Sequence, residues 1–343
     1  MSELHTQLAA LGALVIVAIV GWNAWTTWRA KPRASEPGAD VGSAADSRRD
    51  PAMDGADAPS QGLAGGSLSD RRTALDGLID SIASIAVETE VYGDAALAAM
   101  PATRRVGSKA IAFEGQRSGQ SEWEPVVAGV RYRAYRVGIQ LANRAGAMNE
   151  IEFSEFSVKA HAFAEALGGH ADVPDMQAEV ARARELDEFA SQHDAQLNFT
   201  IRSPGTAWSP GFVQQMAARA GFVLGALPGR MVLPGQTPAS PVLGLAFDTQ
   251  AALADDPEAS ALRSVRLTLD VPQVARSERP FVRLRESVQA LAASMDGRVT
   301  DDTGRELTRE TMDAIGADLE SLYDRLEARD LAAGSPQARR LFA

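Results

Sequence analysis

The chain offers few residues whose type and spacing could perform chemistry. Two acidic pairs, Asp255-Asp256 and Asp301-Asp302, fall in turn-like stretches where solvated loop acids are common. Cysteine is absent, which excludes disulfides and thiolate metal sites. The four histidines are too scattered along the chain to supply a metal-ligand spacing: His5, His161, His170 and His193.

The motifs of nucleophilic and nucleotide chemistry are missing as well. The sequence shows no convincing Ser/His/Asp set, and no Walker loop or dinucleotide-binding glycine pattern follows a predicted strand. We therefore expect no catalytic, cofactor-binding or metal-binding residues and no small-molecule substrate. The chain is predicted not to be an enzyme.

Composition limits the possible partners further. Of the 343 residues, 45 are acidic and 34 basic, which gives a net charge of −11, and no basic stripe stands out along the sequence. Such a chain would repel a polyphosphate backbone, so no nucleic-acid partner is expected. The apolar content of 45% is enough to fill the cores of two ordinary domains.

An uncharged apolar run extends from Leu8 to Trp28. As a helix rising ~1.5 Å per residue it would cross the ~30 Å hydrocarbon core. A cleaved signal peptide would place basic residues before a shorter run, but here Arg29 and Lys31 follow it. A buried soluble helix is the other alternative, yet it would not be apolar on every face. The sequence predicts a permanent single-span anchor, with residues 1–7 outside and the bulk of the chain cytoplasmic.

The next stretch, residues 29–69, is rich in Pro, Gly, Ala, Ser and Asp and has almost nothing to bury. This composition predicts a disordered linker. As a flexible coil its reach would be roughly 30–35 Å, which would hold the following domains near the inner membrane surface.

Beyond the linker, periodicity predicts a folded α+β architecture. Alternating strands are predicted at 197–201 and 265–271, with further strands around 222–227, 231–233 and 241–247. Helices are predicted after the cap Ser209, from Pro280 to Met295, and after the cap Thr308. The order β-α-β-β-β-α-β-α predicts an antiparallel sheet with helices on one face and the other face open.

The preceding stretch repeats this plan. Residues 153–175 and 281–302 share apolar spacing, a helix-ending glycine and an acidic turn beyond it. We therefore expect two tandem related units, with chance similarity of generic helix-turn segments as the alternative. The predicted organisation is a tail (1–7), an anchor (8–28), a linker (29–69), two α+β domains (70–193 and 194–330) and a C-terminal tail (331–343).

The layout of an anchor, a basic flank, a linker and a C-terminal domain resembles the ZipA family of bacterial division proteins. The similarity covers about Gln196–Asp330, and "DGRVTDDTGRELT" is its most specific motif. The resemblance implies a split β-α-β fold, no enzymatic activity, and a shallow groove on the sheet face away from the helices. In that family this groove binds the C-terminal tail of FtsZ.

The alternation of side chains along each strand indicates which residues of this sequence would face the groove. The resemblance thereby assigns the groove to residues of four strands. Thr268 and Asp270 make the groove more polar than is typical of the family. The side of Arg263 and Arg266 would attract acidic residues of a partner tail. The full set implied is Gln196, Asn198, Thr200, Leu227, Phe247, Thr249, Arg266, Thr268 and Asp270.

Three functions stay open at this point. The first is an adaptor in the bacterial inner membrane that tethers FtsZ polymers at midcell through the second half of the chain. The second is an anchored structural module of another envelope complex, which binds a different protein through the first half. The third is a cytoplasmic-facing enzyme or sensor, which would need a deep pocket with convergent ionisable groups.

Overall fold

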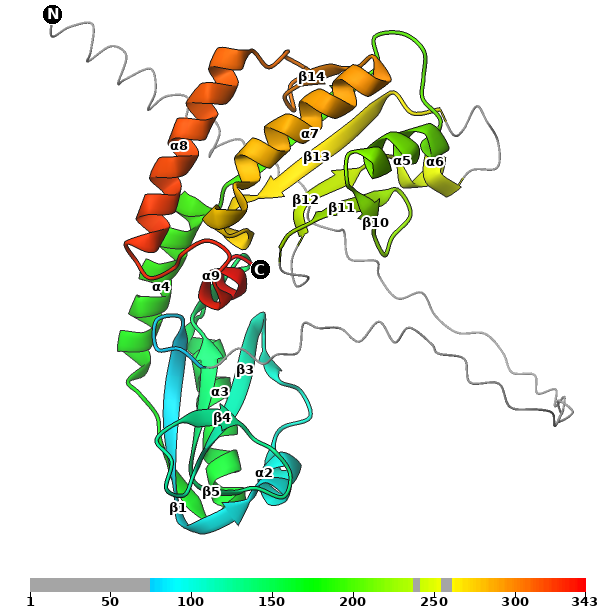
Figure 1. The fold of residues 1–343 in the computed structure, drawn as a ribbon. Coiled ribbons are helices and arrows are strands. Elements are labelled where there is room, and N and C mark those ends of the chain that lie inside the picture. The colour runs from blue at the N-terminus through cyan, green and yellow to red at the C-terminus, as the bar shows by residue number, and fades with distance from the viewer. Residues whose placement is uncertain (1–74, 237–240, 254–260) are drawn as a thin grey trace, which may run out of the picture. The chain divides into compact units, whose positions relative to one another are not determined.

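The computed structural model describes residues 75–236, 241–253 and 261–343 (Figure 1). All of these residues belong to one compact unit, Ser67–Ala343. Within these ranges no helix has the length and apolar character needed to cross a membrane. The predicted anchor Leu8–Trp28 and the linker 29–69 lie outside the described residues.

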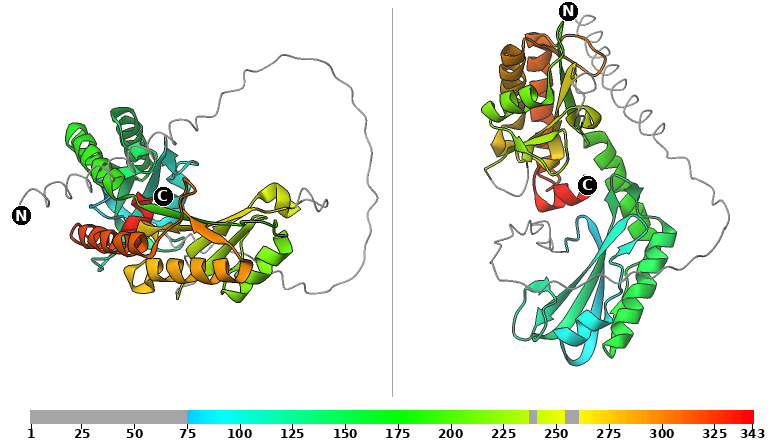
Figure 2. Two further views of the ribbon diagram at one scale, coloured as in Figure 1. Left: turned by 90° about the horizontal axis from the view of Figure 1, so that it is seen from above. Right: turned by 90° about the vertical axis from the view of Figure 1, so that its right-hand side faces the viewer.

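The first half of this unit, which we call the first repeat, is an antiparallel sheet in the order β2-β3-β5-β1-β8, with β4 paired to β3. Figure 2 shows its two long helices, α3 and α4, along one side of the sheet. The strands are β1 (Asp80–Tyr92), β2 (Arg105–Val106), β3 (Lys109–Arg117), β4 (Trp123–Pro125), β5 (Arg131–Gln140) and β8 (Gly169–Asp172). The helices are α2 (Gly93–Ala99), α3 (Glu150–Ala166) and α4 (Met176–His193), and a small hairpin joins β6 (Ala142–Asn143) to β7 (Gly146–Ala147).

Aromatic packing joins α3 to this sheet. The ring of Phe163 lies 4.9 Å from that of Phe113 and 5.7 Å from that of Tyr135, both in edge-on geometry. All three side chains are at most 3% exposed. Asn149 starts α3 with a capping box, which satisfies N–H groups that would otherwise lack partners.

The second repeat is again an antiparallel sheet, in the order β10-β11-β12-β13-β9-β14. Its strands are β9 (Gln196–Arg202), β10 (Val223–Leu224), β11 (Arg230–Pro234), β12 (Pro241–Ala246), β13 (Ser264–Asp270) and β14 (Arg298–Thr300). Its helices are α5 (Pro210–Arg219), α6 (Thr249–Leu253), α7 (Pro280–Met295) and α8 (Arg309–Glu327), with 3-10 turns at Val271–Gln273 and Arg276–Glu278. The predicted α+β class, with antiparallel sheets and helices, is confirmed.

Helix boundaries in the second repeat follow the sequence signals. Ser209 and Thr308 cap α5 and α8 through their side chains, as predicted. The α7 helix spans the predicted range and ends at Asp296, which adopts a left-handed conformation with φ 50°. In Figure 1, α7 runs along β13, against which its buried side packs.

The two repeats share one topology. In the first, the neighbouring strands are β3-β5-β1-β8; in the second, they are β12-β13-β9-β14. In each, a helix (α3 or α7) follows the strand β5 or β13 and leads to a short edge strand (β8 or β14), after which comes a charged helix (α4 or α8). The two halves therefore have the same strand order, as expected for two tandem related units.

The C-terminal residues, expected to form a tail, are folded. Residues Pro336–Leu341 form α9, and Leu341 and Phe342 are each 1% exposed. Arg340 forms an ion pair with Asp80, which is itself 1% exposed. The sequence gives no warning of this, because the apolar residues that bury the segment are few and the partner carboxylate is distant along the chain.

Candidate functional site

The second sheet has one face covered by helices and one that is not. Along β13, Val265, Leu267 and Leu269 are each 0% exposed on the helix side, whereas Arg266 is exposed and Thr268 is partly exposed on the other side. Successive side chains of a strand alternate between faces, so this pattern separates the two sides of the sheet.

Cross-strand pairing extends the uncovered face across the sheet, because directly opposed residues project to the same side. One row runs from Asn198 through Thr268 and Gly244 to Val232. The next row runs from Thr300 through Thr200, Arg266 and Ala246 to Arg230. We call the surface made by these two rows the open face.

Six of the nine predicted groove residues lie on this side of the sheet. Asn198 and Thr268 are opposed, and the Thr268 hydroxyl donates to the Asn198 amide oxygen at 2.9 Å. Thr200 lies in the same sheet face but is only 6% exposed, so it offers little contact area. The residues placed on this side are Gln196, Asn198, Thr200, Arg266, Thr268 and Asp270.

Three predicted residues are elsewhere. Leu227 is 66% exposed but lies in the turn between β10 and β11, not on a strand. Phe247 is only 7% exposed and lies just beyond the end of β12. It follows Leu245 at a spacing of two residues, which favours the helix side rather than the open face. Thr249 opens α6 instead of continuing the strand.

Five open-face residues were not predicted from the sequence. The two rows are completed by Arg230, Val232, Gly244, Ala246 and Thr300. Gly244 lies between two leucines inside β12, which was a usable signal, since a glycine in a strand often marks a place where another group approaches closely.

One end of the predicted groove is occupied by Arg144. Its guanidinium donates to Asp270 at 2.8 Å and to Asp194 at 2.6 Å. Burial acts to lower the pKa of Arg144, but the two carboxylates outweigh it and the pKa is raised. Burial raises the pKa of Asp270, against the opposing effect of Arg144. Asp270 is therefore engaged within the chain and is a poor candidate for partner contact.

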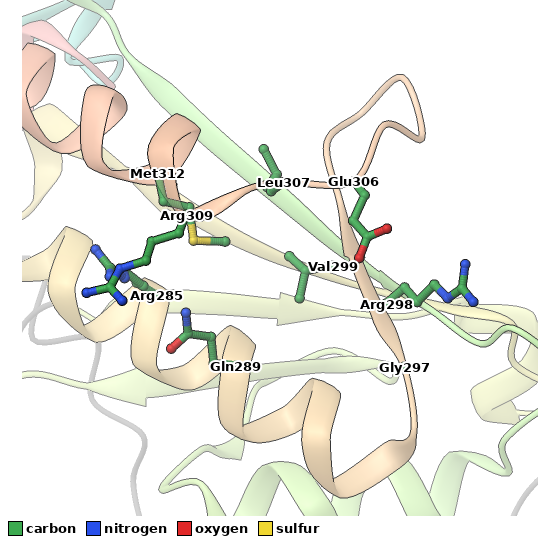
Figure 3. Close-up of a pocket in the computed structure, with 9 residues that line it drawn as sticks. All are labelled: Arg285, Gln289, Gly297, Arg298, Val299, Glu306, Leu307, Arg309 and Met312. Atoms are coloured by element: carbon green, nitrogen blue, oxygen red, sulfur yellow. The ribbon is translucent and has the colours of Figure 1, made fainter.

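A separate shallow cavity of about 510 Å³ lies at the β14 edge (Figure 3). Figure 3 shows Arg285 and Arg309 together on one side of it, while Arg298 extends away on the other. Arg285 is paired with Asp313 at 2.6 Å. Within the described ranges no cluster of His, Cys, Asp or Glu could hold a metal ion.

The second repeat is thus an antiparallel sheet with helices on one face and the open face opposite them. Residues 253–318 match the family model described as ZipA, C-terminal FtsZ-binding domain, a stretch that includes β13, α7 and β14. The match confirms the resemblance to the ZipA family. No curated protein matches the chain closely enough to count as a relative.

Proposed function

We propose that the chain is a membrane-anchored cell-division protein whose open face binds the C-terminal tail of FtsZ. The observation that carries this proposal is the uncovered face of β13, which lies within the stretch that matches the FtsZ-binding domain of ZipA. The matched family is a protein-binding, non-enzymatic one, and its match indicates an FtsZ-binding role in division.

The first repeat is the weaker candidate for this role. Its corresponding sheet face is covered in part by Leu75 and Trp123, which come from the same chain. A partner would have to displace them. This favours the second repeat over the alternative that an envelope protein docks on the first half.

Binding to a shallow face gives modest affinity, because a short peptide pays ordering entropy and buries few anchors. We expect a dissociation constant on the order of micromolar for one contact. Many tethered copies facing one filament gain by effective concentration, which compensates for weak single contacts.

The anchoring part of the proposal rests on sequence. The uncharged run Leu8–Trp28 is followed by basic residues and by the linker 29–69. This order supports a single-pass protein of the bacterial inner membrane with a periplasmic N-terminus. It would hold FtsZ polymers at the membrane and concentrate the protein at midcell.

Two measurements test the proposal. The first is fluorescence anisotropy of a labelled FtsZ tail peptide titrated with the full chain in mild detergent; we expect saturable binding in the micromolar range. The second is imaging of a fluorescent fusion in dividing cells, where we expect a midcell ring. Absence of binding at high protein concentration, together with a uniform membrane signal, would refute the proposal.

A further inference from the structure

The first repeat provides an internal template for how the open face is filled. In the first repeat, Asp172 lies three residues after Gly169 and pairs with Ser84. In the second repeat, Thr300 lies three residues after Gly297 and pairs with Thr200. Both pairs join the short edge strand to the first strand of the repeat. They therefore fix the same register in the two sheets.

From this register the next positions can be equated. The row continues with Arg136 and then Glu114 in the first repeat. In the second repeat it continues with Arg266 and then Ala246. An arginine is thus kept at the same place on the sheet face away from the helices in both repeats, whereas the neighbouring carboxylate exists only in the first repeat.

In the first repeat this arginine belongs to a completed site. The Glu114 carboxylate accepts from Arg136 at 2.6 Å and from the backbone N–H of Leu75 at 2.9 Å. Arg136 in turn donates to the Leu75 carbonyl at 3.1 Å, and its guanidinium lies 4.9 Å from the Trp123 ring centroid. The arginine and carboxylate together hold an incoming segment of backbone.

The Leu75 side chain of that segment also packs against the sheet. Leu75, 5% exposed, packs against Gly138, where an added Cβ would come within 2.4 Å of the leucine. The glycine belongs to the row adjacent to the one that contains the arginine. The first repeat therefore binds a short segment through a charged pair and one apolar side chain placed over a glycine.

The second repeat keeps the arginine, but the carboxylate and the bound segment are missing. Arg266 is exposed and forms no side-chain hydrogen bond or ion pair with any residue that the structure describes. In the adjacent row, Thr268 takes the position that corresponds to Gly138, but the glycine of this row is Gly244 on the neighbouring strand β12, where an added Cβ would meet nothing closer than 4.0 Å. The space over this glycine is open, and Ala246 supplies no carboxylate.

We propose that the open face selects an extended acidic peptide that places a carboxylate on Arg266 and an apolar side chain over Gly244. The partner would thereby supply both groups that Glu114 and Leu75 supply within the first repeat. Two further exposed arginines lie on this side of the sheet, Arg230 in the open face and Arg202 in the row next to it, and both add attraction for acidic residues in a chain that is negative overall. The identity of the peptide as the FtsZ tail rests on the proposed function; its chemistry does not.

Two variants test the two contacts independently. Ala246→Glu introduces the carboxylate found at the equivalent position of the first repeat, so Arg266 becomes paired within the chain. Gly244→Leu fills the space over the glycine with the chain's own side chain. Each should weaken binding of an acidic peptide by about tenfold or more. Ala293→Glu, at an exposed position of α7 on the helix side, is the matched control and should bind like the parent.

Three probes are titrated into the full chain in mild detergent, with anisotropy as the readout and circular dichroism as the folding check. They are the FtsZ tail peptide, the same peptide with its Asp and Glu changed to Asn and Gln, and a synthetic peptide that alternates Asp and Leu. The expected result is binding of both acidic peptides, about tenfold weaker binding of the amide peptide, and loss of binding in both open-face variants.

The failures of the two proposals are distinguishable. If the FtsZ peptide binds equally well with and without its acids, and Ala246→Glu has no effect, the acidic selection is wrong and the FtsZ role stands. If only the Asp-Leu peptide binds, and both variants abolish it, the acidic selection stands and the FtsZ role is wrong. If neither acidic peptide binds, the selection of an acidic peptide is overturned.

Discussion

Removal of the Glu114 carboxylate tests the completed site of the first repeat. Glu114 is 2% exposed, and Glu114→Ala would leave the Leu75 N–H without its acceptor and the Arg136 guanidinium without its carboxylate partner, with the Leu75 carbonyl still accepting from Arg136. Breaking a buried ion pair from one side typically costs about 3–5 kcal/mol. The Arg136 side chain is 19% exposed and contacts the Trp123 ring. Water and the ring therefore still stabilise its charge, which reduces the free-energy cost of losing the ion pair. We expect a loss of about 2–4 kcal/mol.

The assay is urea unfolding followed by circular dichroism, with Arg136→Ala and the double variant completing a cycle. The coupling free energy between the two residues should be about 1–3 kcal/mol, as for contacting groups of one network. The control is Glu155→Ala, which removes a carboxylate that is 50% exposed and paired with Lys159 on α3. It should cost less than about 0.5 kcal/mol. A Glu114→Ala variant as stable as this control would refute the reasoning.

Three further predictions concern other elements. Gly297→Ala should destabilise the fold by about 1–3 kcal/mol in urea unfolding, because its Cβ would come within 2.5 Å of a β9 side chain, whereas Gly244→Ala should be close to neutral; equal losses would contradict the packing described. Arg340→Ala should lower the free energy of unfolding by about 3–5 kcal/mol by leaving the buried Asp80 carboxylate unpaired, and an unchanged midpoint would show that this contact is dispensable. Burial acts to raise the pKa of Asp301. Hydrogen bonds from the Thr303 hydroxyl and from the backbone N–H groups of Thr303 and Arg305 outweigh this effect, so the pKa is lowered from 3.8. Its stabilising effect is therefore complete above pH 3.8 and is lost as pH falls through the lower folded pKa, and an NMR titration midpoint at or above 3.8 would contradict this.

Local signals were sufficient for much of the second repeat. The limits of α7 and the caps Ser209 and Thr308 were predicted because a cap and an apolar stripe are properties of neighbouring residues. The two faces of β13 were predicted for the same reason, since alternation along one strand fixes which residues share a side.

The errors arose where the strand ended and the local pattern could not show it. The prediction extended the third strand to Thr249, but β12 ends at Ala246 and the chain turns into α6. Leu227 was placed on a strand, although a turn separates β10 from β11. The missed contacts are long-range: Glu114 binds the backbone of Leu75, 39 residues away, and no periodicity encodes such a pairing.

The most direct test of a peptide-docking role is site-specific photo-crosslinking in dividing cells. A photoreactive residue at position 268, on the open face, should crosslink to FtsZ, and the crosslink should disappear when Ala246→Glu is added. The same residue at position 293, on the helix side, should give none. Crosslinking to FtsZ at position 293 but not at position 268 would contradict the account.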